Sequence, residues 1–406
     1  MSPNGRLDVQ PWMRDPRTQR MLNALAHDGI TARFVGGCVR DALCAKAVVD
    51  VDLAIDRPPE AAVKALERAR IKVVPTGLKH GTITAVAGGR PYEITTLRRD
   101  VQTDGRHAVV AFTDDWRADA ARRDFTINAM FGDASGNLWD FFDGRGDLAA
   151  GRVRFVGDPA VRIDEDVLRI LRFFRFYAWY GQAPVDAAGL AACRAAADKL
   201  RNLSAERVRK ELLKLLEAAD PAGTIETMAA SGLFAHWLPE YDGTALLQRV
   251  VANERAAAMS DGLRRLAAII GTAGDATVIG KRLRLSTQES LRLTVMLAID
   301  PVIDVAHGPA MMRRQIYHLG NALYVDRLMR LADSGWREAY RLATTWTPPE
   351  LPISGGDVLK AGVPAGRRVG ALVAAVEGWW IDNDFAADRA ACLAELRRRV
   401  DLGEGA

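Results

Sequence analysis

Up to residue 150 the chain carries short apolar runs in which hydrophobic and polar positions alternate. Alternation with a period of two is typical of strands, because successive side chains of a strand point to opposite faces. We predict strands over 34–35, 48–55, 82–86 and 92–97, with glycine pairs marking turns between them. This part of the chain is expected to contain a small mixed sheet.

After Gly157-Asp158-Pro159 the pattern changes to Ala-, Leu- and Arg-rich stretches with apolar residues at helical spacing. It predicts one helix over 161–180 and a second that begins after Ser204, a good N-cap, and runs to about Ala218. Strand patterns almost vanish beyond this point. The sequence therefore predicts an α+β protein with a mixed head followed by an all-α remainder. The expected parts are a head (1–150), a neck (151–220), a body (221–300) and a tail (301–406).

Composition and charge exclude only a few classes of protein. A chain of 406 residues is expected to form two or more domains, and its net charge of +4 does not by itself identify a nucleic-acid binder. Its four cysteines lack the CxxC spacing of a zinc site or disulfide framework. The first residues carry no apolar core of the length typical of a signal peptide, and no apolar run approaches ~18 residues. We expect a soluble, cytoplasmic protein that makes no contact with a membrane, and no obligate protein partner is evident.

Two acidic residues stand out in the segment VVDVDLAID. Asp50 and Asp52 are two apart in an extended run, so both carboxylates can reach one point on the same face. The flanking residues Val49, Val51, Leu53 and Ile55 are expected to anchor the strand in a core. Paired carboxylates facing a phosphate substrate are a usual Mg²⁺ arrangement. An isolated pair of this kind is more often only the polar face of a strand.

The preceding segment, FVGGCVRD, favours the metal-site interpretation of Asp50 and Asp52. Gly36 and Gly37 follow a short strand and open a predicted helix, where backbone N–H groups and the helix dipole favour phosphate. Arg40 adds a cation for a triphosphate. A phosphate cradle, an arginine and a downstream acidic pair are much more specific together than any one of them alone.

These residues resemble the active-site signature of a known family. GGCVRD, then eight residues, then DVDLAI is similar to class II CCA-adding enzymes and bacterial poly(A) polymerases, which have a polymerase-β-like nucleotidyltransferase head. The resemblance implies that Asp50 and Asp52 hold catalytic Mg²⁺ ions while Gly37 and Arg40 bind the phosphates of the incoming nucleotide. Glu93 is a candidate third carboxylate, and is equally well explained as a strand residue.

A second charged segment is RIDEDVLRILRFFRF. Asp166, Arg169, Arg172 and Arg175 recur every three residues in the helix predicted there, so neighbours in the series lie close together. Ion pairing along a helix face would explain a single such pair. The resemblance implies instead that Asp166 and Arg169 read the base and that Arg172 and Arg175 belong to the nucleotide site.

The hydrogen-bonding inventory of an Asp–Arg pair fits that role. An ionised Asp only accepts and an Arg only donates. Adenine and cytosine both present an exocyclic amino donor beside a ring-nitrogen acceptor, so one pair can match both bases. Guanine and uracil present the reverse order, and each group left unpaired in a dry pocket costs about 1–3 kcal/mol.

Further segments extend the resemblance over nearly the whole chain. In RRDFTINAM it implies that Arg123 contacts nucleotide. DFFDGRGD resembles the hinge between head and neck, with Asp143-Gly144 where many relatives have a glycine pair, followed by Asp147. LSAERVRKELLKLL resembles the neck helix that supports the nucleotide site, with Glu206 and Arg207 as polar markers. The tail is expected to bind tRNA.

Two features favour CCA addition over poly(A) addition. His80-Gly81-Thr82 is similar to a run of CCA-adding members, and the polar segment 97–116 resembles the flexible loop of complete CCA enzymes. The predicted function is template-independent addition of C, C and A to the 3′ end of tRNA from CTP and ATP, with release of pyrophosphate. A poly(A) polymerase of the same family and a catalytically silent RNA-binding relative remain the alternatives.

Overall fold

The computed structural model describes residues 2–78, 81–104, 107–271, 274–298, 302–331 and 335–404, with the backbone alone for residues 76, 100–104 and 107–110. The chain forms two compact units. One runs from the N-terminus to Tyr241 and includes Arg282–Arg284; the other comprises Asp242–Lys281 and the residues from Leu285 on. The four-part division at residues 150, 220 and 300 stays a prediction.

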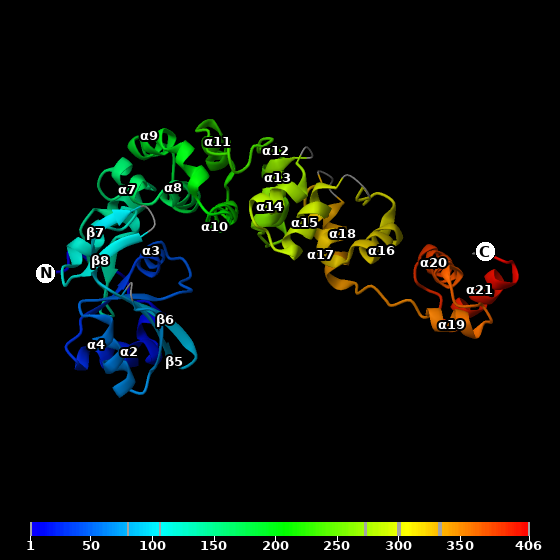
Figure 1. Cartoon of the computed structure of the whole chain (residues 1–406), viewed down its shortest axis with the longest axis horizontal. Coiled ribbons are helices and arrows are strands. Elements are labelled where there is room, and N and C mark those ends of the chain that lie inside the picture. Colours follow the sequence, from blue (N-terminus) through cyan, green and yellow to red (C-terminus); the bar gives the residue numbers. More distant parts are fainter. Residues whose placement is uncertain are drawn as a thin grey trace. The chain divides into compact units, whose positions relative to one another are not determined.

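An eight-stranded mixed sheet forms the head of the first unit (Figure 1). Its order is β1-β10-β9-β2-β3-β6-β5-β4, and β3 and β6 are its one parallel pair. The strands of this sheet are β1 (Gly5–Arg6), β2 (Ala32–Val35), β3 (Asp52–Ile55), β4 (Lys72–Gly77), β5 (Thr82–Ala87), β6 (Arg90–Thr96), β9 (Met130–Gly132) and β10 (Asn137–Asp140). The four predicted strands correspond to β2, β3, β5 and β6.

Alternation along the strands divides the apolar residues between the two faces of this sheet. Leu53 and Ile55 of β3 belong to one core cluster, whereas Ala54 belongs to another that includes Trp116 and Phe131. The helices of the head are α1 (Pro11–Arg14), α2 (Pro16–His27), α3 (Gly37–Leu43), α4 (Pro59–Arg68), α5 (Trp116–Ala121), the 3₁₀ helix η2 (Thr126–Asn128) and α6 (Gly144–Ala149). The first cluster includes residues of α2, α3 and α4, and the second includes residues of α5.

In the polar segment 97–116, expected as a flexible loop, most of the described residues lie in strands. It contains β7 (Arg98–Asp104) and β8 (His107–Phe112), which pair as a separate antiparallel hairpin. His80, whose sequence context favours CCA addition, lies outside the described residues.

The remainder of the chain is helical, apart from turns and connections (Figure 1). The first unit continues with α7 (Pro159–Glu165), α8 (Leu168–Tyr180), α9 (Ala187–Ala195), η3 (Ala197–Asn202), α10 (Ala205–Leu216) and α11 (Ala222–Ala230). The second unit contains α12 (Ala245–Ala256), α13 (Gly262–Ile270), α14 (Ala276–Arg282, whose last residue belongs to the first unit), α15 (Thr287–Leu297), α16 (Gly308–Leu319), α17 (Asn321–Leu328), α18 (Trp336–Thr345), α19 (Gly355–Lys360), α20 (Arg367–Asp382) and α21 (Arg389–Asp401).

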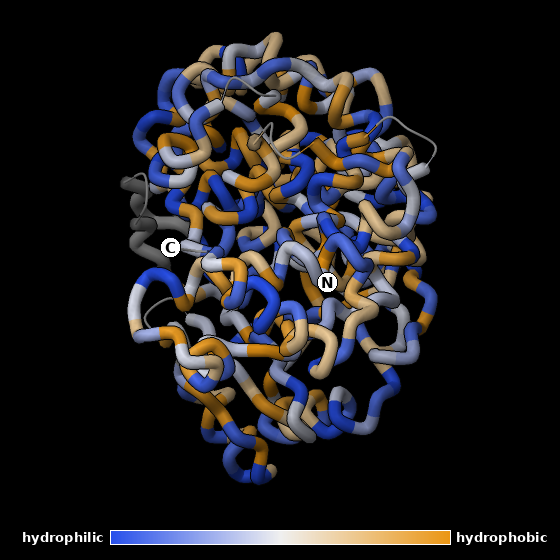
Figure 2. Tube along the Cα trace, turned by 90° about the vertical axis from the view of Figure 1, so that its right-hand side faces the viewer, coloured by the Kyte–Doolittle hydropathy of each residue, from blue (hydrophilic) through white to orange (hydrophobic). Residues whose placement is uncertain are grey.

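Two expectations about these helices are corrected. The helix predicted over 161–180 is two helices, α7 and α8, separated at Asp166, where the backbone is extended (φ −153°). The helix after Ser204 is α10, as predicted, although the Ser204 side chain makes no capping hydrogen bond. Hydrophobic and hydrophilic residues are interspersed along the trace (Figure 2). No helix in the described ranges is long and apolar enough to cross a membrane.

The segment expected as a hinge is tightly built. Asp143 adopts a left-handed conformation (φ 59°), the region that a glycine occupies without strain. A Cβ atom on Gly144 would lie 2.2 Å from the carbonyl oxygen of Thr126, so this position admits only glycine. The fully buried carboxylate of Asp147 accepts hydrogen bonds from Thr126 Oγ1 (2.6 Å), Arg152 Nε (2.6 Å) and Arg154 Nε (2.9 Å).

Candidate active site

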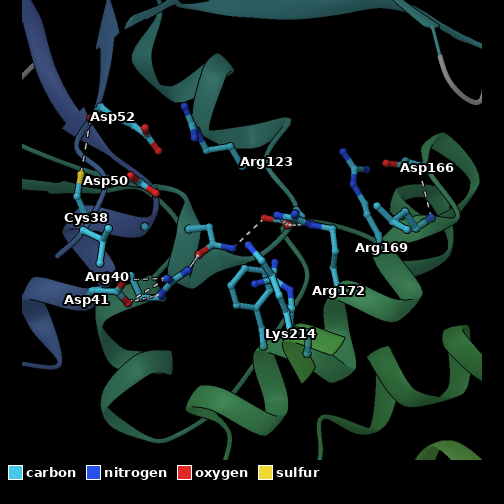
Figure 3. A pocket seen from close by; sticks show the side chains of 18 of the residues that line it. Cys38, Arg40, Asp41, Asp50, Asp52, Arg123, Asp166, Arg169, Arg172 and Lys214 are labelled. Atoms are coloured by element: carbon cyan, nitrogen blue, oxygen red, sulfur yellow. Dashed lines mark hydrogen bonds and ion pairs between the residues drawn. The ribbon is translucent and has the colours of Figure 1, made fainter. Parts of the chain in front are cut away.

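A cavity of about 710 Å³ in the first unit is lined by residues of α3, the start of β3, the segment after α5, α8 and α10 (Figure 3). All nine residues singled out from the sequence line it, namely Gly37, Arg40, Asp50, Asp52, Arg123, Asp166, Arg169, Arg172 and Arg175. Residues that lie far apart in the sequence therefore meet in one cavity.

The acidic pair lies at the beginning of β3. Asp52 is the first residue of the strand, and Asp50 lies exposed two residues before it. Val51 is buried as expected, whereas Val49 is 79% exposed, so the prediction that it anchors a strand was wrong. The extended run is shorter than its hydrophobic pattern indicates because β2 pairs with β3 only from Leu53 to Ile55.

Asp52 has a second carboxylate beside it. In the parallel pairing of β3 with β6 it is the register partner of Glu93, on the sheet face opposite Leu53 and Ile94. Burial raises the pKa of Asp52 to about 6, and the charges of Glu93 and Asp50 add to this effect. Glu93 was considered from the sequence but not assigned, and only the strand pairing distinguishes it from an ordinary strand residue.

The glycine turn forms as predicted. Gly36 has φ 69°, which glycine tolerates, and α3 begins at Gly37. Arg40 of α3 is buried, with 8% of the residue exposed, and its side chain is extensively bonded. It donates to Asn128 Oδ1 (2.7 Å) and to both carboxylate oxygens of Asp41 (3.0 and 3.1 Å), and its guanidinium lies 4.3 Å from the ring centre of Tyr180. The charge of Arg40 is therefore held in one place.

Asp124 and Asn128 continue this network across the cavity. Asn128 also donates to Asp124 Oδ1 (3.1 Å), and Asp124 Oδ2 accepts from Arg172 Nε (2.7 Å). Burial opposes ionisation of Asp124, but the charge of Arg172 prevails and the pKa is lowered. A continuous series of hydrogen bonds thus joins Arg40 to Arg172.

Two more predicted arginines are fixed by buried carboxylates. Arg123 donates to Asp119 Oδ2 from Nε (3.1 Å) and Nη2 (2.8 Å). Arg175 Nε lies 2.5 Å from Glu211 Oε2, and its guanidinium lies 4.1 Å from the ring centre of Phe176. Bonds to ionised partners restrict the rotamers of these long side chains before any substrate arrives.

The break between α7 and α8 changes the expected Asp166–Arg169 arrangement. Asp166 Oδ1 accepts from the backbone N–H of Leu168 (3.1 Å), which explains why the helix is interrupted there. Both Asp166 oxygens accept from Arg207 Nη2 (3.0 and 2.8 Å). Arg169 forms an ion pair with Glu165 and donates to the carbonyl oxygen of Arg162 (2.8 Å). Asp166 is thus paired with Arg207 and Arg169 with Glu165, rather than with each other.

Several lining residues were missed or only noted from the sequence. Arg207 was a polar marker of the neck, while Arg122 and Lys214 were not singled out. Arg207 and Lys214 are seven apart on α10, a spacing that places them on one helix face and could have linked both to the cavity.

Comparisons with known proteins indicate the same family as the sequence motifs. Residues 32–154 match the Poly A polymerase head domain, and residues 185–243 match the family described as a probable RNA and SrmB-binding site of polymerase A. The mitochondrial CCA tRNA nucleotidyltransferase 1 of Danio rerio is 33% identical over 90% of this chain and 86% of that enzyme. The CCA-adding enzyme of Levilactobacillus brevis is 30% identical over 88% of this chain and 91% of that enzyme.

Structural comparison extends the likeness to almost the entire length. The crystal structure of the Bacillus stearothermophilus CCA-adding enzyme in complex with CTP matches with a TM-score of 0.80 and 26% identity, covering 96% of this chain and 99% of that one. Sequence identity above 30% over most of a curated relative, together with this agreement in fold, establishes the kinship. This chain is a member of the CCA-adding tRNA nucleotidyltransferase family.

Proposed function

We propose that this enzyme adds C, C and A in turn to the 3′ end of tRNA, using CTP and ATP and releasing pyrophosphate. One observation carries the proposal: a single cavity holds an acidic pair, a glycine turn with Arg40, and Asp166 with Arg169. Relatives over most of the chain are named for CCA addition, and solved members of the family include complexes with CTP, ATP and tRNA.

Asp50 and Asp52 would hold a divalent cation, which we propose is Mg²⁺. Their oxygen donors suit a hard cation, and Glu93 beside Asp52 raises the local negative charge that a cation would offset. Among the described residues no group of three or more metal-ligating side chains is preformed, so phosphate oxygens and water would complete the coordination. When bound, the cation supplies charge stabilisation at the phosphate under attack and promotes ionisation of the RNA 3′-hydroxyl.

The other predicted residues would hold the triphosphate. The backbone at Gly37, at the start of α3, offers N–H groups, while Arg40, Arg123, Arg172 and Arg175 offer guanidinium groups fixed by their carboxylate partners. Positioning and charge stabilisation account for most of the catalysis in phosphoryl transfer, so donors held in place before binding are effective.

Asp166 and Arg169 would read the base. Asp166 has two oxygens with about four lone-pair sites, and three bonds occupy them here, which leaves one site to accept from an exocyclic amino group. Arg169 uses Nη1 for Glu165 and Arg162 and donates once from Nη2 to the carbonyl oxygen of Arg122 (3.2 Å). Within the described parts of the chain, its Nε–H and a second Nη2–H remain for ring-nitrogen and carbonyl acceptors. This arrangement favours cytosine and adenine over guanine and uracil.

The helical parts would bind tRNA through shape and phosphate contacts. We propose residues 1–150 as the catalytic head, 151–220 as the base-reading neck, 221–300 as the body and 301–406 as the tRNA-binding tail. A cytoplasmic location remains a prediction from the sequence, since the zebrafish relative is named as mitochondrial.

The deciding experiment is to sequence the 3′ ends made with CTP and ATP together on tRNA lacking CCA. A defined CCA end on tRNA is expected, with little extension of an unrelated RNA. A long A-tail on any RNA would instead identify a poly(A) polymerase, the alternative that the description of the matching head domain keeps open. Replacing Asp50 and Asp52 by Asn should abolish incorporation and leave tRNA binding near normal; a catalytically silent protein would show no incorporation before the change either.

A further inference from the structure

The arginines of the cavity are already committed to protein carboxylates. Each of the seven that line it forms an ion pair at 2.9 Å or less, and six carboxylates serve them. The arginines are Arg40, Arg122, Arg123, Arg169, Arg172, Arg175 and Arg207, and their partners are Asp41, Asp119, Glu165, Asp124, Glu211 and Asp166. The positive charge of these side chains is largely compensated before a substrate enters.

Lys214 differs from them. It lines the same cavity from the last turn of α10, its side chain is exposed, and no carboxylate partner is found for it within the described parts of the chain. Its backbone is fixed, since its carbonyl oxygen accepts a hydrogen bond from the indole N–H of Trp179 (2.7 Å). In the view of Figure 3 it is labelled between Arg40 and Arg172, apart from Asp50 and Asp52.

We infer that Lys214 binds the β- or γ-phosphate of the incoming nucleoside triphosphate. The inference rests on the proposed function, because it takes that triphosphate as the ligand of the cavity. The α-phosphate must face Asp50 and Asp52, where the chemistry occurs, so the rest of the triphosphate extends away from them. The carboxylates of Asp50 and Asp52 offset the charge of any cation held between them, and the paired arginines contribute little net charge, so the negative charge of a triphosphate is not yet matched. The ammonium group of Lys214, which can donate three hydrogen bonds, supplies what is missing.

A simpler account is that Lys214 only stabilises the C-terminal end of α10, where a cation is favourable. That role predicts a small loss of stability on substitution and no dependence on the number of phosphates in the ligand. A contact with the β- or γ-phosphate instead predicts little loss of stability and a loss of affinity only for nucleotides that carry these phosphates. The two accounts can therefore be separated by experiment.

The test compares CTP with CMP. We expect Lys214→Gln to weaken CTP binding about tenfold in calorimetric titration, the effect of losing one charge-assisted hydrogen bond. Affinity for CMP, which lacks the β- and γ-phosphates, should change less than about twofold. Lys214→Arg, which keeps the charge, should restore most of the CTP affinity. Lys210→Gln is the matched control, because Lys210 is exposed on the same helix but is not among the residues that line the cavity.

Other outcomes would overturn the inference. Equal losses for CTP and CMP, equal losses for Gln and Arg, or unchanged CTP binding would each remove the phosphate contact. A loss of tRNA affinity with CTP binding intact would assign Lys214 to an RNA phosphate. The 3′ product of the unsubstituted enzyme decides the proposed function separately: an enzyme that made A-tails would fail that proposal, while ATP and AMP would still test Lys214.

Discussion

Replacing Arg207 by Met would test how Asp166, a proposed base-reading residue, is held. Arg207 Nη2 contacts both oxygens of Asp166, at 3.0 and 2.8 Å, and lies on α10, whereas Asp166 lies at the junction of α7 and α8. Without it, Asp166 keeps its bond to the N–H of Leu168 but can rotate away from the base. Arg207 would thus act on the nucleotide through Asp166 in its proposed role, and its loss should reduce base selectivity more than catalysis of a correctly placed nucleotide.

The magnitude follows from the exposure of the pair. A hydrogen bond between charged groups contributes about 1.5–3 kcal/mol when shielded. Here the side chains of Arg207 and Asp166 are 31% and 30% exposed, so solvent screening reduces the coupling to about 1 kcal/mol. This corresponds to about a fivefold change. We expect the kcat/KM ratio of ATP to GTP to fall about fivefold, with a loss of unfolding free energy of at most about 1 kcal/mol.

The assay measures kcat/KM for ATP and GTP on tRNA ending in CC, at low and high salt. The difference between the two enzymes should shrink at high salt, because a partly exposed ion pair is screened. Arg201→Met is the matched control, since Arg201 forms a weak exposed pair with Asp198 (3.8 Å) and does not line the cavity. An unchanged ATP-to-GTP ratio in Arg207→Met would refute the reasoning.

The remaining predictions concern the head. Because the pKa of Asp52 is raised to about 6, affinity for Mg²⁺ measured by calorimetry should fall about tenfold per pH unit below that value, and a flat profile would contradict the metal assignment. The metal-free protein should lose unfolding free energy as pH rises from about 4 to about 6, by up to about 3 kcal/mol relative to Asp52→Asn, since the folded pKa exceeds the unfolded one. Asp147→Asn should destabilise the enzyme by about 1–3 kcal/mol in urea unfolding, because it removes a buried acceptor of three hydrogen bonds whose arginine donors are partly exposed; an unchanged stability would show that the site relaxes. Gly144→Ala should prevent folding or cost several kcal/mol, whereas Asp143→Gly should change stability by less than about 1 kcal/mol, and similar effects of the two would contradict the backbone geometry.

The sequence predicted the parts of the site that depend on short-range spacing. Asp50 and Asp52, and the glycine turn before Arg40, lie within single local elements, where periodicity and turn chemistry act directly. The mixed head and helical remainder followed from the same periodicities. The three-residue strand β9, all of it buried, is too short to show alternation and was missed.

Features that depend on contacts between distant segments could not be predicted from the sequence. The spacing from Asp166 to Arg175 is ideal for one helix, yet Asp166 bonds to Leu168 N–H and to Arg207, and the helix breaks. Glu93 acquires significance only from its register with Asp52, whereas Lys214 shares a helix face with Arg207 and is brought to the cavity by the packing of α10 against α8. Side-chain period predicts which face a residue occupies, but not which other element covers that face.

The double attachment of Asp166 has an evolutionary consequence. The carboxylate that would select the base also interrupts a helix and ties α10 to the junction of α7 and α8. In copying enzymes the instruction for the next nucleotide resides in a separate strand, which can vary without harm to the polymerase. In this protein any drift in nucleotide choice at this position would also disturb the architecture of the chain, so natural selection acts on both properties at once.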